Sequence, residues 1–164
     1  MSIQGIMRPG YCQIRVLDMD AALTHYRDAL GLDVVHTGPD GRVYLKAYDE
    51  FDHHSIVLRP AEEAGMDAMG WKCTSDADLE NYGRRLTKAG IEVRAIEPGE
   101  QPGLGRQIAF RIPTGHELRL YAEMELSERC PETENPHVWT TEPRGMRVLR
   151  FDHCLLYGPE VEAT

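Results

Sequence analysis

The feature that most constrains the fold is an internal repeat in the spacing of apolar residues. The pattern Leu-x2-Tyr-x3-Leu occurs twice, 56 residues apart, at Leu23, Tyr26 and Leu30 and again at Leu79, Tyr82 and Leu86. Each copy has the period of an amphipathic helix, and a glycine that can end a helix follows it (Gly31 and Gly90). A repeat of this kind predicts two similar supersecondary modules packed in tandem.

Short apolar stretches around each predicted helix indicate strands, because they are bounded by glycine, proline and polar turns. In the first module, strands are expected at 9–16, 32–37, 43–48 and 55–59, with a helix at 21–30. In the second, strands are expected at 66–73, 91–96, 105–112 and 117–121. Asp18 or Asp20 is suited to cap the first helix, and Ser75, Asp76 or Asp78 the second. Each module therefore has the order βαβββ.

A third copy begins near the end of the chain. With an offset of 142 residues, Arg150 aligns with Arg8 and Cys154 with Cys12, while His153 takes the place of Tyr11. Residues 150–158 are therefore predicted to be a strand that ends at a turn. The proline-containing stretch 126–147 has little periodicity and is predicted to be a linker.

These boundaries define the expected domains. Residues 1–125 are predicted to be one domain, built from modules 7–64 and 65–123, and residues 148–164 the start of another. The sequence ends where the repeat calls for a third helix. We therefore expect the chain to be the N-terminal portion of a longer protein.

Charge and cysteine content limit the function classes. A formal net charge of −9 disfavours binding to nucleic acid or to an anionic membrane surface, since both require a basic patch. No apolar run approaches the roughly 20 residues of a membrane span, and no signal peptide is evident. The four cysteines are scattered without close pairs, which predicts reduced thiols in a cytoplasmic protein: Cys12, Cys73, Cys130 and Cys154.

Histidines are the candidate metal ligands. His53 and His54 are adjacent, and on an extended segment their side chains are expected to point to opposite faces, away from a shared metal. His116 follows a Pro-Thr-Gly turn and is expected to help end it. His153 alternates with Leu155 and Tyr157 on the predicted strand, a costly position for an imidazole without a partner. The residue pattern alone favours a hydrogen-bonded core histidine there over a metal ligand.

Five segments in this order and spacing resemble the catechol 2,3-dioxygenase family: 7–10, 15–19, 41–47, 65–70 and 150–153. This family contains type I extradiol ring-cleavage enzymes of the vicinal oxygen chelate superfamily. The resemblance implies an α+β fold of tandem βαβββ modules, also called glyoxalase-like. This chain would supply two complete modules and the first strand of a third.

The resemblance also implies a function. The family holds Fe(II) in a C-terminal domain through two histidines and one glutamate, and the first of these histidines matches His153. The other ligands and the acid–base histidine would lie beyond Thr164, so no catalytic or organic-cofactor residue is expected in this chain. Tyr11, at the equivalent position of the first module, fits a domain that binds no metal.

The expected reaction cleaves catechol, or a substituted catechol, with O2 next to its hydroxyls, giving 2-hydroxymuconate semialdehyde in aromatic catabolism. The expected enzyme is a cytoplasmic homotetramer, and residues 1–164 alone are expected to be inactive. One alternative is a free-standing ligand-binding or resistance module of the same superfamily. Another is an isomerase or lyase of the superfamily, which would need metal ligands in modules 1 and 2, where Tyr11 is unsuitable.

Overall fold

The structure is a computed structural model that describes residues 4–128 and 144–163. It divides the chain into two compact units. The first unit contains residues 11–66 with the described parts of 125–151, and the second contains residues 4–10, 67–124 and 152–163. Strand β1 (Ile6–Val16) begins in the second unit and continues into the first.

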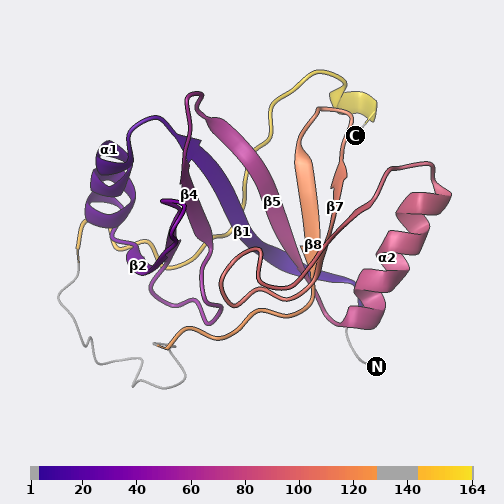
Figure 1. The fold of residues 1–164 in the computed structure, drawn as a ribbon, viewed down its shortest axis with the longest axis horizontal. Helices are drawn as coiled ribbons and strands as arrows, with labels where there is room; N and C mark the ends of the chain where they lie inside the picture. The colour runs from indigo at the N-terminus through magenta and orange to yellow at the C-terminus, as the bar shows by residue number, and fades with distance from the viewer. Residues whose placement is uncertain (1–3, 129–143, 164) are drawn as a thin grey trace. The chain divides into compact units, whose positions relative to one another are not determined.

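The first unit has the predicted βαβββ order (Figure 1). After β1 come α1 (Met19–Leu23), a π-helical segment η1 (Thr24–Ala29), β2 (Asp33–Thr37), β3 (Val43–Lys46) and β4 (Ile56–Pro60). The strand order is β2-β3-β4-β1, in which β4 pairs antiparallel with β3 and parallel with β1. The last strand of the module therefore returns beside its first.

The helical segment of the first unit packs on one face of this sheet. Leu23, Tyr26 and Leu30 contact the buried core, as their spacing predicted. Asp18 caps α1, since its Oδ1 accepts a hydrogen bond of 3.0 Å from the N–H of Ala21. The prediction of one regular helix is wrong in detail. From Thr24 the backbone adopts the wider π-helical turn, whose bonds include Leu30 N–H to His25 O at 2.9 Å.

The second unit repeats the plan with β5 (Gly65–Cys73), α2 (Asp76–Lys88), β6 (Arg94–Ile96), β7 (Gln107–Arg111) and β8 (Glu117–Tyr121). The order is β5-β8-β7-β6, and β8 pairs parallel with β5. Helix α2 lies against β7 and β8 in Figure 1. Its core residue Leu79 packs with Cys73 and Leu120, as the repeated spacing predicted.

Both ends of α2 are closed by local chemistry. The hydroxyl of Ser75 accepts a hydrogen bond of 3.2 Å from the N–H of Asp78, which selects Ser75 among the three predicted caps. Gly90 has φ +80, and the N–H groups of Gly90 and Ile91 donate to Thr87 O and Leu86 O, each at 3.0 Å. Because this turn uses residues 90–91, β6 begins at Arg94, three residues later than predicted.

The strand predicted at 150–158 is absent from the structure, which has only a short 3-10 helix η3 (Val161–Ala163) after it. A strand needs a neighbouring strand to satisfy its backbone groups. Within the described residues no strand pairs with this segment, so its alternating sequence does not produce a buried face. No helix among the described residues is long and apolar enough to cross a membrane.

Candidate functional site

His153, the predicted metal ligand, is an exposed side chain. Its side chain is 84% accessible, and Leu155 and Tyr157 are also exposed, at 69% and 79%. The expected half-buried strand position is therefore wrong for the described residues. The sequence pattern favoured a core histidine, but the imidazole of His153 faces solvent. His153 is therefore not part of a packed core in the described residues.

His153 has an acidic neighbour in contact with its ring. Nδ1 of His153 lies 3.1 Å from Oδ2 of Asp152. A carboxylate that accepts the Nδ1 proton fixes the tautomer in which Nε2 keeps its lone pair, and metal-binding histidines are commonly held in this way. The pair therefore fits one imidazole ligand, through Nε2. Within the described residues no group of three histidine, cysteine, aspartate or glutamate side chains lies close enough to hold a metal ion.

The chain leading to His153 is attached to the first unit. The N–H of Val148 donates to Leu30 O at 2.9 Å, and Val148 also packs on the core of that unit. Further along, the N–H of Phe151 donates to Oε1 of Glu50 at 2.6 Å. Sequence analysis did not predict these attachments, because their partners lie more than a hundred residues away in the chain.

Tyr11 occupies the position in the first module that aligns with His153. Its side chain is fully buried, and its ring centroid lies 5.9 Å from that of His54, which is also fully buried. Tyr44 packs edge-on against the same histidine at 4.9 Å. Tyr11 is therefore a packed core residue with a ring contact to His54.

His53 and His54 contact each other, contrary to the expectation that they point apart. Their Nδ1 atoms are 3.0 Å apart. The reason is a bend at His53, which removes the alternation that an extended segment would have. One Nδ1 must donate and the other accept, so only one of the two rings carries a proton on Nδ1. Burial lowers the pKa of His53, and the nearby His36 lowers it further.

A polar hollow of about 460 Å³ lies beside His53. Its lining includes acidic side chains from β2 and from the segment after β8, namely Asp33, Glu125 and Glu128, together with the buried Lys46. Arg144 already pairs with Asp33 at 2.7 Å. The lining of this hollow contains neither His153 nor Tyr11.

Two further histidines, His25 and His116, take ordinary structural positions. His25 lies exposed on the π-helical segment, edge-on to Tyr26. Nδ1 of His116 lies 2.9 Å from Oγ1 of Thr114, which agrees with the expected role in ending that turn. His137 and Cys130 lie outside the described residues. The described cysteines form no disulfide: Cys12, Cys73 and Cys154.

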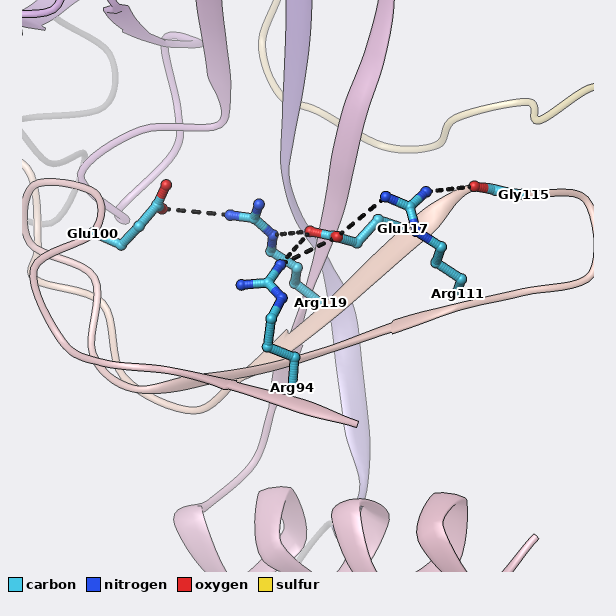
Figure 2. A network of polar contacts seen from close by, with 6 residues as sticks. All are labelled: Arg94, Glu100, Arg111, Gly115, Glu117 and Arg119. Carbon is cyan, nitrogen blue, oxygen red and sulfur yellow. Dashed lines mark hydrogen bonds and ion pairs between the residues drawn. The ribbon is translucent and has the colours of Figure 1, made fainter. Parts of the chain in front are cut away.

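One face of β8 carries a charged network that sequence analysis missed (Figure 2). Glu117, only 12% exposed, accepts from Arg119 at 2.8 Å and from Arg94 at 3.2 Å, and Arg111 lies 3.7 Å away. Arg119 is 8% exposed and also reaches Glu100. The alternation of Glu117 and Arg119 with two leucines was visible in the sequence, but it predicts a solvated face. The structure instead buries these charges against one another.

Comparison with known proteins shows what the chain is similar to. Residues 66–125 match the family described as "Catechol 2,3-dioxygenase-like N-terminal domain". Over 162 residues the chain is 46% identical to a metapyrocatechase from Pseudomonas sp. (strain CF600), a match that covers 98% of this chain and 53% of that protein. The chain is a homologue of the extradiol dioxygenases. The resemblance noted in the sequence is thereby confirmed.

Other extradiol dioxygenase relatives agree in fold and extent. The crystal structure of the 2,3-dioxygenase LapB from Pseudomonas sp. KL28 superposes with a TM-score of 0.86 at 33% identity, covering 99% of this chain and 57% of that one. A manganese-dependent 2,3-dihydroxybiphenyl 1,2-dioxygenase from Geobacillus genomosp. 3 is 29% identical over 90% of this chain and 47% of its own. The α+β fold of tandem βαβββ modules is confirmed. The chain spans about half the length of these relatives.

Proposed function

We propose that this chain is the N-terminal portion of an extradiol dioxygenase that cleaves catechol, or a substituted catechol, with O2. The observation that carries the proposal is the 46% identity to a metapyrocatechase over nearly the whole chain. In the proposed reaction the ring bond beside the two hydroxyls breaks. Both atoms of O2 enter the product, 2-hydroxymuconate semialdehyde. This places the enzyme in the breakdown of aromatic compounds.

The proposal assigns His153 as one ligand of the catalytic metal, through Nε2. Support comes from its exposure and from the Asp152 carboxylate on Nδ1, which leaves Nε2 available. A metal held there would supply open coordination positions for the substrate and for O2. The other protein ligands are proposed to lie outside these 164 residues, because the chain covers only 53% of the metapyrocatechase relative.

We propose Fe(II) as the metal. Imidazole and carboxylate ligands with open positions suit a non-haem Fe(II) centre. One relative is named as manganese-dependent, so reconstitution of the metal-free enzyme with either ion separates the two cases. We expect Fe(II) to restore ring cleavage, whereas activity restored by Mn(II) and not by Fe(II) would contradict the assignment.

The domain proposal follows from the same relationship. Residues 1–125 would form the domain without metal, residues 126–147 the linker, and residues 148–164 the beginning of the catalytic domain. The buried Tyr11 supports the first assignment, because a phenol packed in the core is a poor Fe(II) ligand. We further propose a cytoplasmic homotetramer, to be checked by light scattering of the purified enzyme.

The test uses the full-length enzyme that contains this chain. His153→Ala is expected to lower bound metal and ring cleavage by more than about a hundredfold, since loss of even an outer partner of a ligand costs 10–100-fold. His25→Ala, which removes an exposed imidazole from η1, is the matched control. Mass spectrometry of metal content and the absorbance of the yellow product are the measurements. Full metal content in His153→Ala would refute the ligand assignment.

A second experiment tests the isolated chain. Residues 1–164, supplied with Fe(II) and catechol, are expected to form no ring-cleavage product, because one imidazole cannot hold the metal in a catalytic geometry. Yellow product from this polypeptide would contradict the proposal. Tight catechol binding without turnover would instead support a ligand-binding module.

A further inference from the structure

Glu50 is a buried carboxylate in the loop between β3 and β4. It is 9% exposed, and it accepts three hydrogen bonds. Two are local: Oε2 accepts from the N–H of Ala47 at 2.7 Å and from the hydroxyl of Ser55 at 2.5 Å. The third joins Oε1 to the N–H of Phe151 at 2.6 Å and spans 101 residues of sequence.

The two kinds of bond have different consequences. The bonds to Ala47 and Ser55 close the loop between two strands of the first unit, and Oε2 alone accepts both. Oε1 acts outside the loop, on the backbone of Phe151. Hydrogen bonds to an ionised carboxylate are short and about twice as strong as neutral ones. The long-range bond therefore holds the chain at Phe151 more firmly than a backbone–backbone contact would.

Phe151 ends a series of attachments along the same segment. The N–H of Tyr48 donates to Val148 O at 3.3 Å, and the N–H of Asp49 donates to Leu149 O at 3.0 Å. The guanidinium of Arg150 donates to Oδ2 of Asp49 at 2.5 Å. Residues 148–151 are thus held one after another by residues 48–50, and Glu50 holds the last of them.

We propose that Glu50 is a positioning residue for the metal centre, acting through the backbone of Phe151 on His153. This inference rests on the proposed role of His153 as a ligand. Two residues span at most about 7 Å when extended, so a fixed Phe151 confines where the imidazole can reach. A metal site needs its ligand atoms within about 0.2 Å of their ideal distances. The loop between β3 and β4 thereby prepares the ligand for binding.

Removing the hydrogen bond between Glu50 and Phe151 should lower the affinity for the metal, while the metal ligands themselves stay unchanged. Ordering the backbone of one further residue on binding costs roughly a factor of ten in affinity. Glu50→Ala is therefore expected to speed metal release about tenfold. Arg150→Ala, which removes the exposed ion pair with Asp49, is expected to speed it less.

The experiment compares variants of the full-length, metal-loaded enzyme. The rate of metal loss to an excess of chelator is followed well below the unfolding temperature, and the thermal midpoint of each variant is measured alongside. Glu117→Ala is the matched control: it also removes a nearly buried carboxylate with several partners, but these partners lie on β6, β7 and β8. His153→Ala tests the ligand assignment itself.

Faster metal release in Glu50→Ala, with Glu117→Ala releasing metal at the wild-type rate despite a lowered midpoint, supports the inference. Equal rates of metal release in Glu50→Ala and the wild type overturn it. Faster metal release in both Glu50→Ala and Glu117→Ala, in proportion to their lowered thermal midpoints, also overturns it. If Glu50→Ala does not fold, Arg150→Ala decides in the same way. Metal retained by His153→Ala would instead refute the proposed function, so the two failures are distinguishable.

Discussion

The contact between Gly10 and Tyr121 permits a quantitative prediction about stability. Gly10 lies in β1, and a Cβ added there would sit 1.9 Å from the hydroxyl oxygen of Tyr121 and 2.7 Å from Cζ of its ring. Carbon–oxygen contacts are normally about 3.3 Å or longer. Tyr121 is fully buried, so its ring cannot move into solvent. The substitution Gly10→Ala must therefore displace a packed ring by more than an ångström.

Two terms of opposite sign set the expected change in the free energy of unfolding. Overpacking a well-filled core costs roughly 1–3 kcal/mol, and the short approach here places the cost near about 3 kcal/mol. Replacing glycine with alanine reduces the entropy of the unfolded chain, which returns about 0.4–1 kcal/mol because Gly10 has no positive φ. The net loss is about 2 kcal/mol, which corresponds to roughly 6 °C in the thermal midpoint.

The assay is urea unfolding with Gly83→Ala as the control. Gly83 lies inside α2, where an added Cβ would meet only Cδ1 of Ile108 at 3.6 Å, an ordinary contact. The same chemical change should therefore raise stability there by about 0.8–1 kcal/mol through helix propensity. An unfolding midpoint for Gly10→Ala at or above that of the wild type would refute the close packing of Tyr121 on β1.

Three further predictions concern local chemistry. Ser75→Ala removes the cap of α2 and should lower the free energy of unfolding by about 1 kcal/mol in chemical denaturation. Burial raises the pKa of Cys73 to about 11, so a maleimide at pH 8 should label the more accessible Cys154 first; faster labelling of Cys73 would contradict this. Burial lowers the pKa of His53. Below about pH 6.5, His53 therefore binds a proton more readily in the unfolded chain than in the folded chain. Stability should therefore fall on acidification, and His53→Gln should flatten that dependence in urea titrations between pH 7.5 and 5.5.

Much of the fold was predictable because it depends on contacts that are close in sequence. The spacing of Leu79, Tyr82 and Leu86 predicted α2, and Ser75 and Gly90 closed its two ends through neighbouring backbone groups. The repeat then predicted the βαβββ order of both units. Some element boundaries differ from the prediction because local hydrogen bonds compete. The N–H of Ile91, for example, donates to Leu86 O at the end of α2, so β6 begins later than predicted.

The candidate site was less predictable, because its environment depends on residues far apart in the chain. The residue pattern singled out His153 through its alignment with Tyr11, whereas its metal-ligand role came only from the family resemblance and stays a prediction. It also predicted a buried strand position, which the structure contradicts since the described residues supply no partner strand. Because Asp152 precedes His153 in the sequence, a contact between them could be expected. The sequence does not determine which ring nitrogen the carboxylate contacts.

The sequence by itself determined the repeated module and the residue types that close its helices, since hydrophobic period and capping act over a few residues. Only the tertiary structure decided which polar groups meet. It bent the chain at His53 so that two adjacent imidazoles touch, and it brought three arginines to the carboxylate of Glu117. It also brought Glu50 to the backbone of Phe151. Such pairings follow from the position of whole strands, which no local pattern specifies.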